Sequence, residues 1–175
     1  LAQCSRASYS KEINVNLIGT INGTKLALEK MESQGHGHIL NMASIAGHIP
    51  APFLSIYAAT KFGMVGFTRS LQEELAQKNS AVKLSLISPG FIRSDMTEKN
   101  KFPEWLSFLL STPDAVASEI IRGIKKNKKE IYPTTSGKLM RGMHKVAPQS
   151  TVRSSKILLT RSFKDLILRR FQPPE

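Results

Sequence analysis

The chain has 175 residues, of which 41% are hydrophobic and 22% are charged. That length is enough for one domain with a hydrophobic core, and the sequence contains no apolar run of about 18 residues that would indicate a transmembrane helix. Its single cysteine, Cys4, excludes an intramolecular disulfide and is typical of a reducing compartment. We therefore expect a cytoplasmic protein.

The formal net charge of +12 is concentrated in the last third of the chain. Residues 1–121 contain 11 Lys and Arg against 10 Asp and Glu, a net charge of +1, whereas residues 122–175 contain 14 against 3, a net charge of +11. We therefore expect a nearly neutral body over residues 1–135 and a basic C-terminal extension over residues 136–175.

The first predicted elements are a helix and a strand. Apolar residues recur at helical spacing from Lys11 to about Met31, and a turn at Gly35–Gly37 ends this helix. The short apolar segment HILNMAS, residues 38–44, predicts a buried strand. Two prolines and a glycine in IAGHIPAPF, residues 45–53, predict a loop.

A second helix and a second strand follow. The segment from Ser55 to about Lys78 has helical spacing and no proline, so it predicts a long helix with Ser55 as its N-cap. VKLSLIS, residues 82–88, predicts a buried strand that stops at Pro89–Gly90.

The last predicted elements are shorter. Residues 91–112 are expected to be irregular, with short helical pieces, and the sequence Thr-Pro-Asp at 112–114 opens a helix that runs to about Lys126. EIYP, residues 130–133, predicts a short strand. Because strands and helices alternate, we expect an α/β fold with a parallel sheet and right-handed crossovers.

Tyr57 and Lys61 stand four positions apart in the sequence IYAATKFG. On a helix these two side chains share one face. An ammonium near a phenol favours the phenolate and lowers the tyrosine pKa from its usual value of about 10. Such a tyrosine can exchange a proton with an alcohol or a ketone near neutral pH. The spacing by itself is common, and an exposed Tyr–Lys pair is the alternative.

Ser44 and the Pro89–Gly90 turn follow the carboxyl ends of the two predicted strands. Ligands of open parallel sheets bind beyond this edge. The helix that carries Tyr57 starts from the same edge, so the three features meet at one site if the strands are adjacent. The Ser44 hydroxyl can then hold a substrate oxygen beside the phenol, although it could also serve only as a loop cap.

Four segments in this order resemble successive motifs of the short-chain dehydrogenase/reductase family, and the resemblance spans residues 13–97. The segments are NVNLIGT, ILNMASIAG, YAATK and SPGFIRSDM. Ser44 precedes Tyr57 by thirteen positions, which is the spacing of the family. The resemblance implies a Rossmann-like parallel sheet with flanking helices.

The resemblance also implies a role for each matching residue. Asn16, Ser44, Tyr57 and Lys61 would form the catalytic tetrad. Tyr57 would be the general acid and base, and Lys61 would lower its pKa and bind the nicotinamide ribose. Ser44 would orient the substrate oxygen and stabilise charge on it. Asn16 would hold a water that links Lys61 to solvent, although Asn14 is an adjacent competitor and Asn16 could simply satisfy a helix backbone group.

The implied reaction is hydride transfer between NAD or NADP and a carbonyl or alcohol. The implied cofactor contacts are Tyr57, Lys61, Pro89, Gly90, Ile92 and Ser94. Ile92 would act through its backbone. The family usually has threonine at the position of Ser94, which could instead cap a short helix. We expect no metal site.

The sequence lacks two motifs that a complete member of this family contains. These are a glycine-rich turn after a first strand and a later Asn-Ala-Gly stretch. GHGH, residues 35–38, precedes a strand instead of following one. We therefore expect that the first strands of the fold are missing and that this chain alone binds cofactor weakly and is inactive. We expect the sequence to be part of a longer enzyme, and a genuine short form is the alternative. The residue that selects NAD or NADP would lie in the missing part.

The basic C-terminal residues could contact the domain itself, a second subunit or a membrane surface. After Gly137 we expect an irregular basic segment and a last amphipathic helix at about residues 154–171. That helix could pack on the domain or on a second subunit, as in a homo-oligomer, or lie on an anionic membrane surface. Nucleic-acid binding is not expected, because basic residues are not interleaved with exposed aromatic residues.

Residues 91–112 include four large apolar side chains that predict a lid over a hydrophobic substrate such as a lipid or steroid, although they could equally be core. They are Phe102, Trp105, Phe108 and Leu109. The alternative to an enzyme is a non-catalytic binding or regulatory protein that keeps the shell of the fold. The complete Ser-Tyr-Lys set favours the enzyme.

Overall fold

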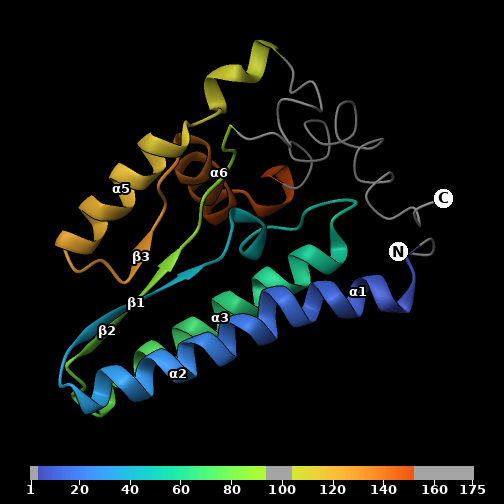
Figure 1. Cartoon of the computed structure of the whole chain (residues 1–175). Coiled ribbons are helices and arrows are strands. Elements are labelled where there is room, and N and C mark those ends of the chain that lie inside the picture. The colour runs from blue at the N-terminus through green and yellow to red at the C-terminus, as the bar shows by residue number, and fades with distance from the viewer. Residues whose placement is uncertain (1–3, 94–103, 152–175) are drawn as a thin grey trace.

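The structure is a computed structural model that describes residues 4–93 and 104–151 (Figure 1). Its helical elements, including one π-helical and two 3-10 segments, alternate with three strands. In chain order they are α1 (Arg6–Ile13), the π-helical η1 (Asn14–Ile18), α2 (Gly19–Ser33), β1 (Gly37–Met42), the 3-10 turn η2 (Ile45–Gly47), α3 (Ser55–Gln77), β2 (Val82–Ile87), the 3-10 segment η3 (Glu104–Leu109), α5 (Pro113–Lys125), β3 (Glu130–Ile131) and α6 (Thr135–Val146).

The three strands form one parallel sheet in the order β1-β2-β3. All six residues of β1 pair with β2, from Gly37 opposite Val82 to Met42 opposite Ile87. The short strand β3 pairs only with the last two residues of β2. The predicted α/β class and parallel sheet are confirmed, and each strand lies within two residues of its predicted limits.

Helices α2 and α3 lie side by side on one side of the sheet, and α5 lies on the other side beside β3 (Figure 1). Two apolar clusters join α3 to the strands. The first contains Ile39, Leu75, Val82 and Leu84, and the second contains Ala43, Met64, Val65 and Leu86. Leu86 is fully buried, as expected for a central strand covered on both faces.

The first helix begins earlier than predicted. Elements α1, η1 and α2 follow one another without a break, so helical structure starts at Arg6 instead of Lys11. The reason is a cap, because the Ser5 hydroxyl accepts a hydrogen bond from the backbone N–H of Ser8. The helical run ends before Gly35, whose φ of 74° is in the left-handed region that favours glycine.

Two predicted caps have different outcomes. Thr112 caps α5 as predicted, because its hydroxyl accepts a hydrogen bond from the N–H of Ala115. The prediction for Ser55 is wrong: Ser55 is the first residue of α3, and the N-cap is Leu54, which provides no side-chain bond. Loop 45–53 also contains the short η2 turn, which Ser44 caps through its hydroxyl.

The predicted irregular segment after Gly137 is wrong for its first part. Residues Thr135–Val146 form α6, and the Thr134 hydroxyl caps this helix by accepting a hydrogen bond from the N–H of Gly137. Basic residues such as Lys138 do not prevent a helix, because lysine has good helix propensity. The predicted helix at 154–171 lies outside the described residues.

In the part of the chain that the structure describes, no helix has the length and apolar character needed to span a membrane.

Candidate active site

Tyr57 and Lys61 lie one turn apart near the start of α3, and their side chains meet. The Lys61 Nζ is 5.5 Å from the centroid of the Tyr57 ring. This is the juxtaposition that the four-residue spacing predicts. The ammonium is therefore close enough to the ring for a cation–π interaction.

Lys61 also connects α3 to the carboxyl end of the sheet. Its Nζ donates a 3.0 Å hydrogen bond to the backbone carbonyl of Met42, the last residue of β1. Burial lowers the pKa of Lys61 below its ordinary value, because the charged form loses hydration. A lysine ammonium has three N–H donors, so this bond leaves capacity for a ligand hydroxyl.

Asn16 lies on the side of the first helix that faces α3. Its Nδ2 donates a 3.3 Å hydrogen bond to the hydroxyl of Thr60, the residue before Lys61. The Thr60 hydroxyl in turn donates to the Tyr57 carbonyl at 2.7 Å. The competing residue Asn14 is exposed, whereas Asn16 is half-buried and contacts α3.

The π-helical segment η1 is centred on Asn16. A π-helical turn widens the backbone locally, and such turns are frequent at functional sites. The Thr20 hydroxyl donates a 2.7 Å hydrogen bond to the carbonyl of Asn16, which satisfies that group within the widened turn. Asn16 therefore does more than satisfy a helix backbone group, because its side chain contacts α3.

Ser44 stands two residues after β1, at the start of η2. Its Oγ accepts a 3.2 Å hydrogen bond from the N–H of Ala46, so it acts as a local cap. The next residue, Ile45, donates its N–H to the carbonyl of Pro89 at 2.8 Å. The two loops that follow β1 and β2 are therefore joined at the same edge of the sheet, as predicted.

The Pro89–Gly90 turn continues into a short bridged segment. Ile92 forms an isolated parallel bridge with Ser111, and the Arg93 N–H donates to the Ser111 carbonyl at 2.9 Å. The bridge keeps the chain after Gly90 extended, at the edge where ligands of parallel sheets bind. Ser94 lies outside the described residues.

The apolar lid is only partly covered by the structure. Phe102 lies outside the described residues, and Phe108 in η3 is 74% exposed. A side chain with this exposure is not a core residue. The prediction that this segment contacts a hydrophobic substrate stays a prediction.

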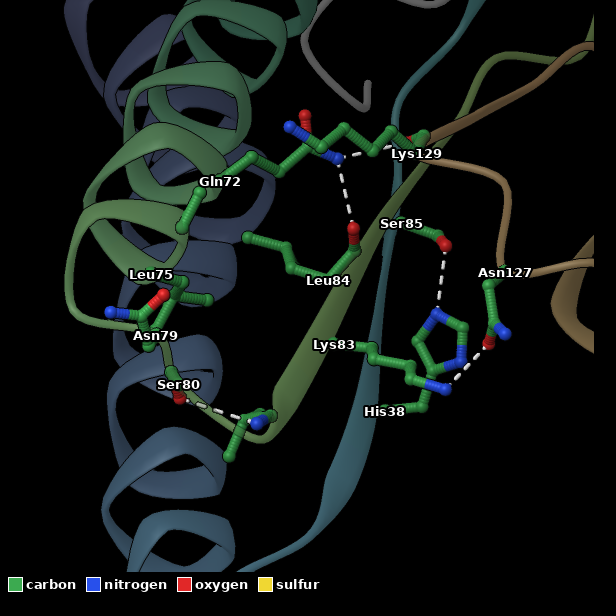
Figure 2. Close-up of a pocket in the computed structure, with 12 residues that line it drawn as sticks. His38, Gln72, Leu75, Asn79, Ser80, Lys83, Leu84, Ser85, Asn127 and Lys129 are labelled. Carbon is green, nitrogen blue, oxygen red and sulfur yellow. Dashed lines mark hydrogen bonds between the residues drawn. The ribbon is translucent and has the colours of Figure 1, made fainter.

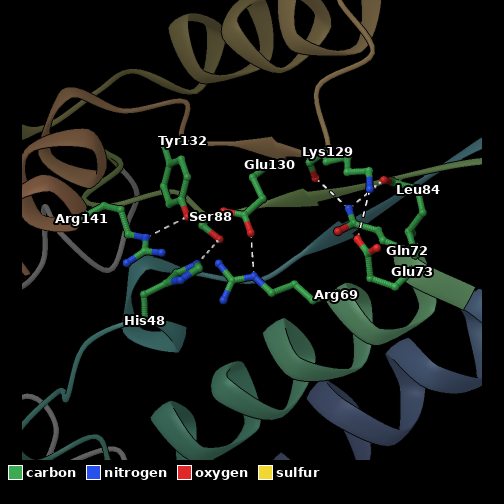
Figure 3. Close-up of polar contacts among 10 residues, drawn as sticks. All are labelled: His48, Arg69, Gln72, Glu73, Leu84, Ser88, Lys129, Glu130, Tyr132 and Arg141. Atoms are coloured by element: carbon green, nitrogen blue, oxygen red, sulfur yellow. Dashed lines mark hydrogen bonds and ion pairs between the residues drawn. The ribbon is translucent and has the colours of Figure 1, made fainter. Parts of the chain in front are cut away.

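A polar network beneath the two loops was not predicted (Figure 3). The His48 Nε2 is 2.9 Å from the Ser88 hydroxyl, which links the loop after β1 to the end of β2. Its ring also packs at 5.5 Å against the ring of Tyr132. Burial, with the nearby charges of Arg141 and Arg69, lowers the pKa of His48 to about 4, so this histidine is neutral at pH 7.

Glu130 is the negatively charged residue on which this network converges. Its carboxylate accepts a 2.6 Å hydrogen bond from Arg69 and a 2.7 Å hydrogen bond from the Tyr132 hydroxyl. Burial by itself raises the pKa of Glu130, but these hydrogen bonds outweigh burial and leave the pKa below its usual value. Arg141 completes the network by donating to the Tyr132 oxygen at 3.1 Å. Helices α3 and α6 are therefore linked through β3.

A cavity of about 270 Å³ lies at the opposite end of the strands (Figure 2). Its wall includes Val82, the first residue of β2, and His38, whose Nε2 is 2.8 Å from the Ser85 hydroxyl. Lys83 on the same wall donates to the Asn127 side chain at 2.7 Å. None of the predicted site residues lines this cavity, and ligands of open parallel sheets bind at the other edge. We therefore do not place the active site here.

The contacts of three residues near the site could not be read from the sequence. Thr60 is part of the YAATK segment, but its bond to Asn16 joins residues 44 positions apart. His48 and Ser88 are likewise 40 positions apart. The only available signal was their place beside the motifs, and serine and threonine near strand ends are common without any function.

Comparison with known proteins agrees with this fold and identifies the family. A family model described as short chain dehydrogenase matches residues 1–104. Carbonyl reductase family member 4 of Xenopus laevis is 44% identical over 89 residues, covering 51% of this chain and 37% of the relative. The 17-beta-hydroxysteroid dehydrogenase 13 of Homo sapiens is 35% identical over 150 residues, covering 85% of this chain and 48% of the relative. This chain thus spans half or less of the length of these two relatives.

The fold is also similar to that of a short chain dehydrogenase from Burkholderia cenocepacia in complex with NADP. The TM-score is 0.73 at 18% identity, and the match covers 86% of this chain and 60% of that chain. At this identity the likeness is one of fold. Together with the family model, it shows that the chain belongs to the short chain dehydrogenase family, as its four motifs predicted.

Proposed function

We propose that this chain is the catalytic part of an NAD(P)-dependent oxidoreductase that interconverts an alcohol and a carbonyl. The observation that carries the proposal is the position of the Lys61 ammonium, 5.5 Å from the Tyr57 ring centroid and bonded to the last carbonyl of β1. This arrangement puts a cation and a phenol at the ligand-binding edge of a parallel sheet. The carbonyl that Lys61 contacts belongs to Met42, two residues before Ser44.

In carbonyl reduction, Tyr57 donates its phenolic proton to the substrate oxygen as negative charge develops there. A nicotinamide cofactor held by these residues would supply the hydride that reaches the carbonyl carbon. Ser44 donates a hydrogen bond to the same oxygen and stabilises its charge. Lys61 stabilises the phenolate that remains, and the steps reverse for alcohol oxidation. The Asn16–Thr60 contact orients the first helix against α3 next to this proton donor.

The residues present fit such a cofactor by the chemistry of their donors. Lys61 is a half-buried ammonium with three N–H groups, and the neighbouring hydroxyls are neutral donors and acceptors. These groups suit the hydroxyls of a ribose and the amide of a nicotinamide. We propose that Lys61, Tyr57 and the turn Pro89–Gly90–Ile92 hold that end of the cofactor.

We further propose that the complete cofactor site includes a segment of polypeptide that precedes this chain in the whole protein. This chain covers 48% of the human relative. Strand β1 forms one edge of the described sheet, and its apolar side chains Leu40 and Met42 are 40% and 47% exposed. An unpaired strand edge can accept a further strand, and the exposed apolar side chains on one face can be covered by a further element. This chain alone is then expected to bind NADP(H) weakly, and micromolar affinity in a titration would overturn that expectation.

Exposed apolar residues on the long helices support the proposal that the whole protein is a homo-oligomer. Val15 in η1, Leu26 in α2 and Phe62 in α3 are 66%, 67% and 45% exposed. We propose that these side chains lie in a contact between subunits, because apolar side chains gain free energy when they are removed from water. Sedimentation of the full-length protein tests this, and a monomer at micromolar concentration would contradict it.

Isotope transfer tests the proposed reaction directly. The full-length protein, incubated with NADPH or NADH deuterated at the reactive carbon and with a panel of hydrophobic ketones, is expected to yield an alcohol that carries deuterium at the former carbonyl carbon. Mass spectrometry of the product measures this transfer. If no ketone or alcohol in the panel supports it with either cofactor, the enzymatic interpretation is wrong and the non-catalytic alternative gains support.

A further inference from the structure

The turn after β2 is held by two hydroxyl groups from the start of α6. The backbone N–H of Gly90 donates a 2.8 Å hydrogen bond to the Thr134 hydroxyl, and the N–H of Phe91 donates a 3.0 Å bond to the Ser136 hydroxyl. These contacts join residues 44 and 45 positions apart, so neither follows from local sequence.

Both hydroxyl groups are buried, and the two segments approach too closely for ordinary side chains. Thr134 and Ser136 are each 1% exposed. A Cβ added to Gly90 would lie 2.5 Å from the Ser136 oxygen and 2.6 Å from the backbone nitrogen of Gly137. A Cβ added to Gly137 would lie 3.0 Å from the nitrogen of Gly90. The absence of side chains at these glycines is what permits the two hydrogen bonds.

The same turn is tied to the rest of the site on its other sides. The Pro89 carbonyl accepts the N–H of Ile45, next to Ser44, and the Ser88 N–H donates to Ile131 at 2.9 Å. Beyond the turn, the Phe91 carbonyl accepts the N–H of Ser111 at 3.1 Å. The position of the turn is therefore set jointly by the Ser44 loop, β3, α6 and the segment before α5.

We propose that Thr134 and Ser136 are positioning residues that fix the backbone of Gly90–Ile92 against the nicotinamide end of the cofactor. This inference rests on the proposed function. It extends the site to residues 134–137, which lie beyond residues 1–104 matched by the family model. It also gives α6 a role at the site, although neither residue touches the reacting atoms.

The physical reason is the cost of an unsatisfied buried N–H group. If the Thr134 hydroxyl is removed, the Gly90 N–H loses its acceptor where water has little access, and the turn must move or stay unpaired. Because the turn contacts the cofactor and not the proton donor, we expect the loss mainly in cofactor affinity.

The first measurement is hydrogen exchange at the amides of Gly90 and Phe91. Thr134→Val is expected to speed exchange at Gly90, and Ser136→Ala at Phe91, by about tenfold. Thr134→Ser keeps the hydroxyl and is expected to restore protection. Thr135→Val is the matched control, because Thr135 is the exposed neighbour on the same helix turn. Unchanged exchange in both Thr134→Val and Ser136→Ala would overturn the proposal.

The second measurement is the Kd and KM for NADP(H) in the full-length protein that carries the same substitutions. Thr134→Val and Ser136→Ala are expected to raise both constants about tenfold with a smaller change in kcat, whereas Thr134→Ser and Thr135→Val leave them unchanged. Ser136→Ala keeps the Thr134 cap of α6, so the test survives if Thr134→Val misfolds. If the wild-type protein binds the cofactor and Ser136→Ala has the same Kd and KM, this inference alone is overturned. If the wild-type protein binds no nicotinamide cofactor, the proposed function is overturned as well.

Discussion

Gly47 lies directly against the backbone of Lys61. A Cβ placed on Gly47 would stand 2.6 Å from the Lys61 carbonyl oxygen and 2.8 Å from its carbonyl carbon. These atoms belong to the interior of a helix and cannot move independently of it. The η2 turn can therefore rest on α3 only because residue 47 has no side chain, and this contact sets the distance between the Ser44 loop and the Tyr57–Lys61 pair.

Replacing Gly47 by alanine is expected to push η2 away from α3. Overpacking of this kind destabilises a protein by about 1–3 kcal/mol. We also expect a loss of turnover of at least about tenfold, because Ser44 moves with the turn. Urea unfolding and steady-state rates measure the two effects.

Gly66→Ala is the matched control for this prediction. Gly66 lies in the same helix, and nothing stands within 4 Å of a Cβ placed there. Alanine in a helix interior is favoured over glycine by about 0.5–1 kcal/mol, so this variant should be more stable than the wild type. If Gly47→Ala behaved like Gly66→Ala, the proposed packing of η2 on α3 would be incorrect.

Stability is expected to fall on acidification because of His48. Its pKa is about 4 in the folded protein against an ordinary 6.5, so between these values the unfolded chain binds more protons than the folded one. The free energy of unfolding should therefore decrease as the pH falls from 6.5 to 4, by about 2–3 kcal/mol from this group. Urea titrations at several pH values measure the decrease.

The contribution of His48 is separated from that of the carboxylates by two variants. His48→Gln can still bond to the Ser88 hydroxyl but does not titrate, so its stability should fall less over this pH range. His36→Gln alters an exposed histidine and should keep the wild-type slope. A His48→Gln protein that loses as much stability as the wild type would show that His48 is not kept neutral by the fold.

The Arg69–Glu130 ion pair is expected to contribute more to stability than the surface pair of Lys129 with Glu73. The Glu130 side chain is 29% exposed and accepts hydrogen bonds from Arg69 and Tyr132, whereas the Glu73 side chain is 68% exposed. Glu130→Gln should lower the free energy of unfolding by about 1–3 kcal/mol, and Glu73→Gln by less than about 1 kcal/mol. Equal effects of the two substitutions in urea unfolding at pH 7 would contradict the importance of the network in Figure 3.

Lys61→Met is expected to separate stability from function. The charged form of Lys61 is disfavoured by burial, so an apolar side chain of similar length should change the free energy of unfolding by less than about 1 kcal/mol. Turnover should nevertheless fall by about 10²-fold or more, because the phenol loses its neighbouring cation. Urea unfolding and kcat are the measurements, and a Lys61→Met enzyme with wild-type kcat would remove Lys61 from the mechanism.

Much of the fold could be predicted from local pattern. The three strands, α3 and α5 follow from hydrophobic spacing, proline and the Thr112 cap, because those signals act within one element. The meeting of Tyr57 with Lys61 follows for the same reason, since both lie on one helix. The prediction of an irregular segment after Gly137 is wrong because a basic composition does not prevent a helix, and the Thr134 cap marks the start of α6.

The contacts that hold the site together depend on the tertiary fold and could not be predicted. The Ser136 hydroxyl bonds to Phe91, and His48 bonds to Ser88, between segments that are distant in sequence. Serine, threonine and histidine occur at many loop positions, and only the assembled sheet shows which of them meet. Asn16 is an intermediate case, because the family motif points to it but its bond to Thr60 required the packed helices.

The most direct test of the central claim is the effect of Tyr57→Phe on turnover and on cofactor affinity, measured on the full-length protein. Phenylalanine keeps the ring and removes only the hydroxyl that we propose as the proton donor. We predict a fall in kcat of at least about 10²–10⁴-fold, with a Kd for NADP(H) within about threefold of the wild type. A Tyr57→Phe protein that retains a large part of the wild-type kcat would show that the proton donor is another group.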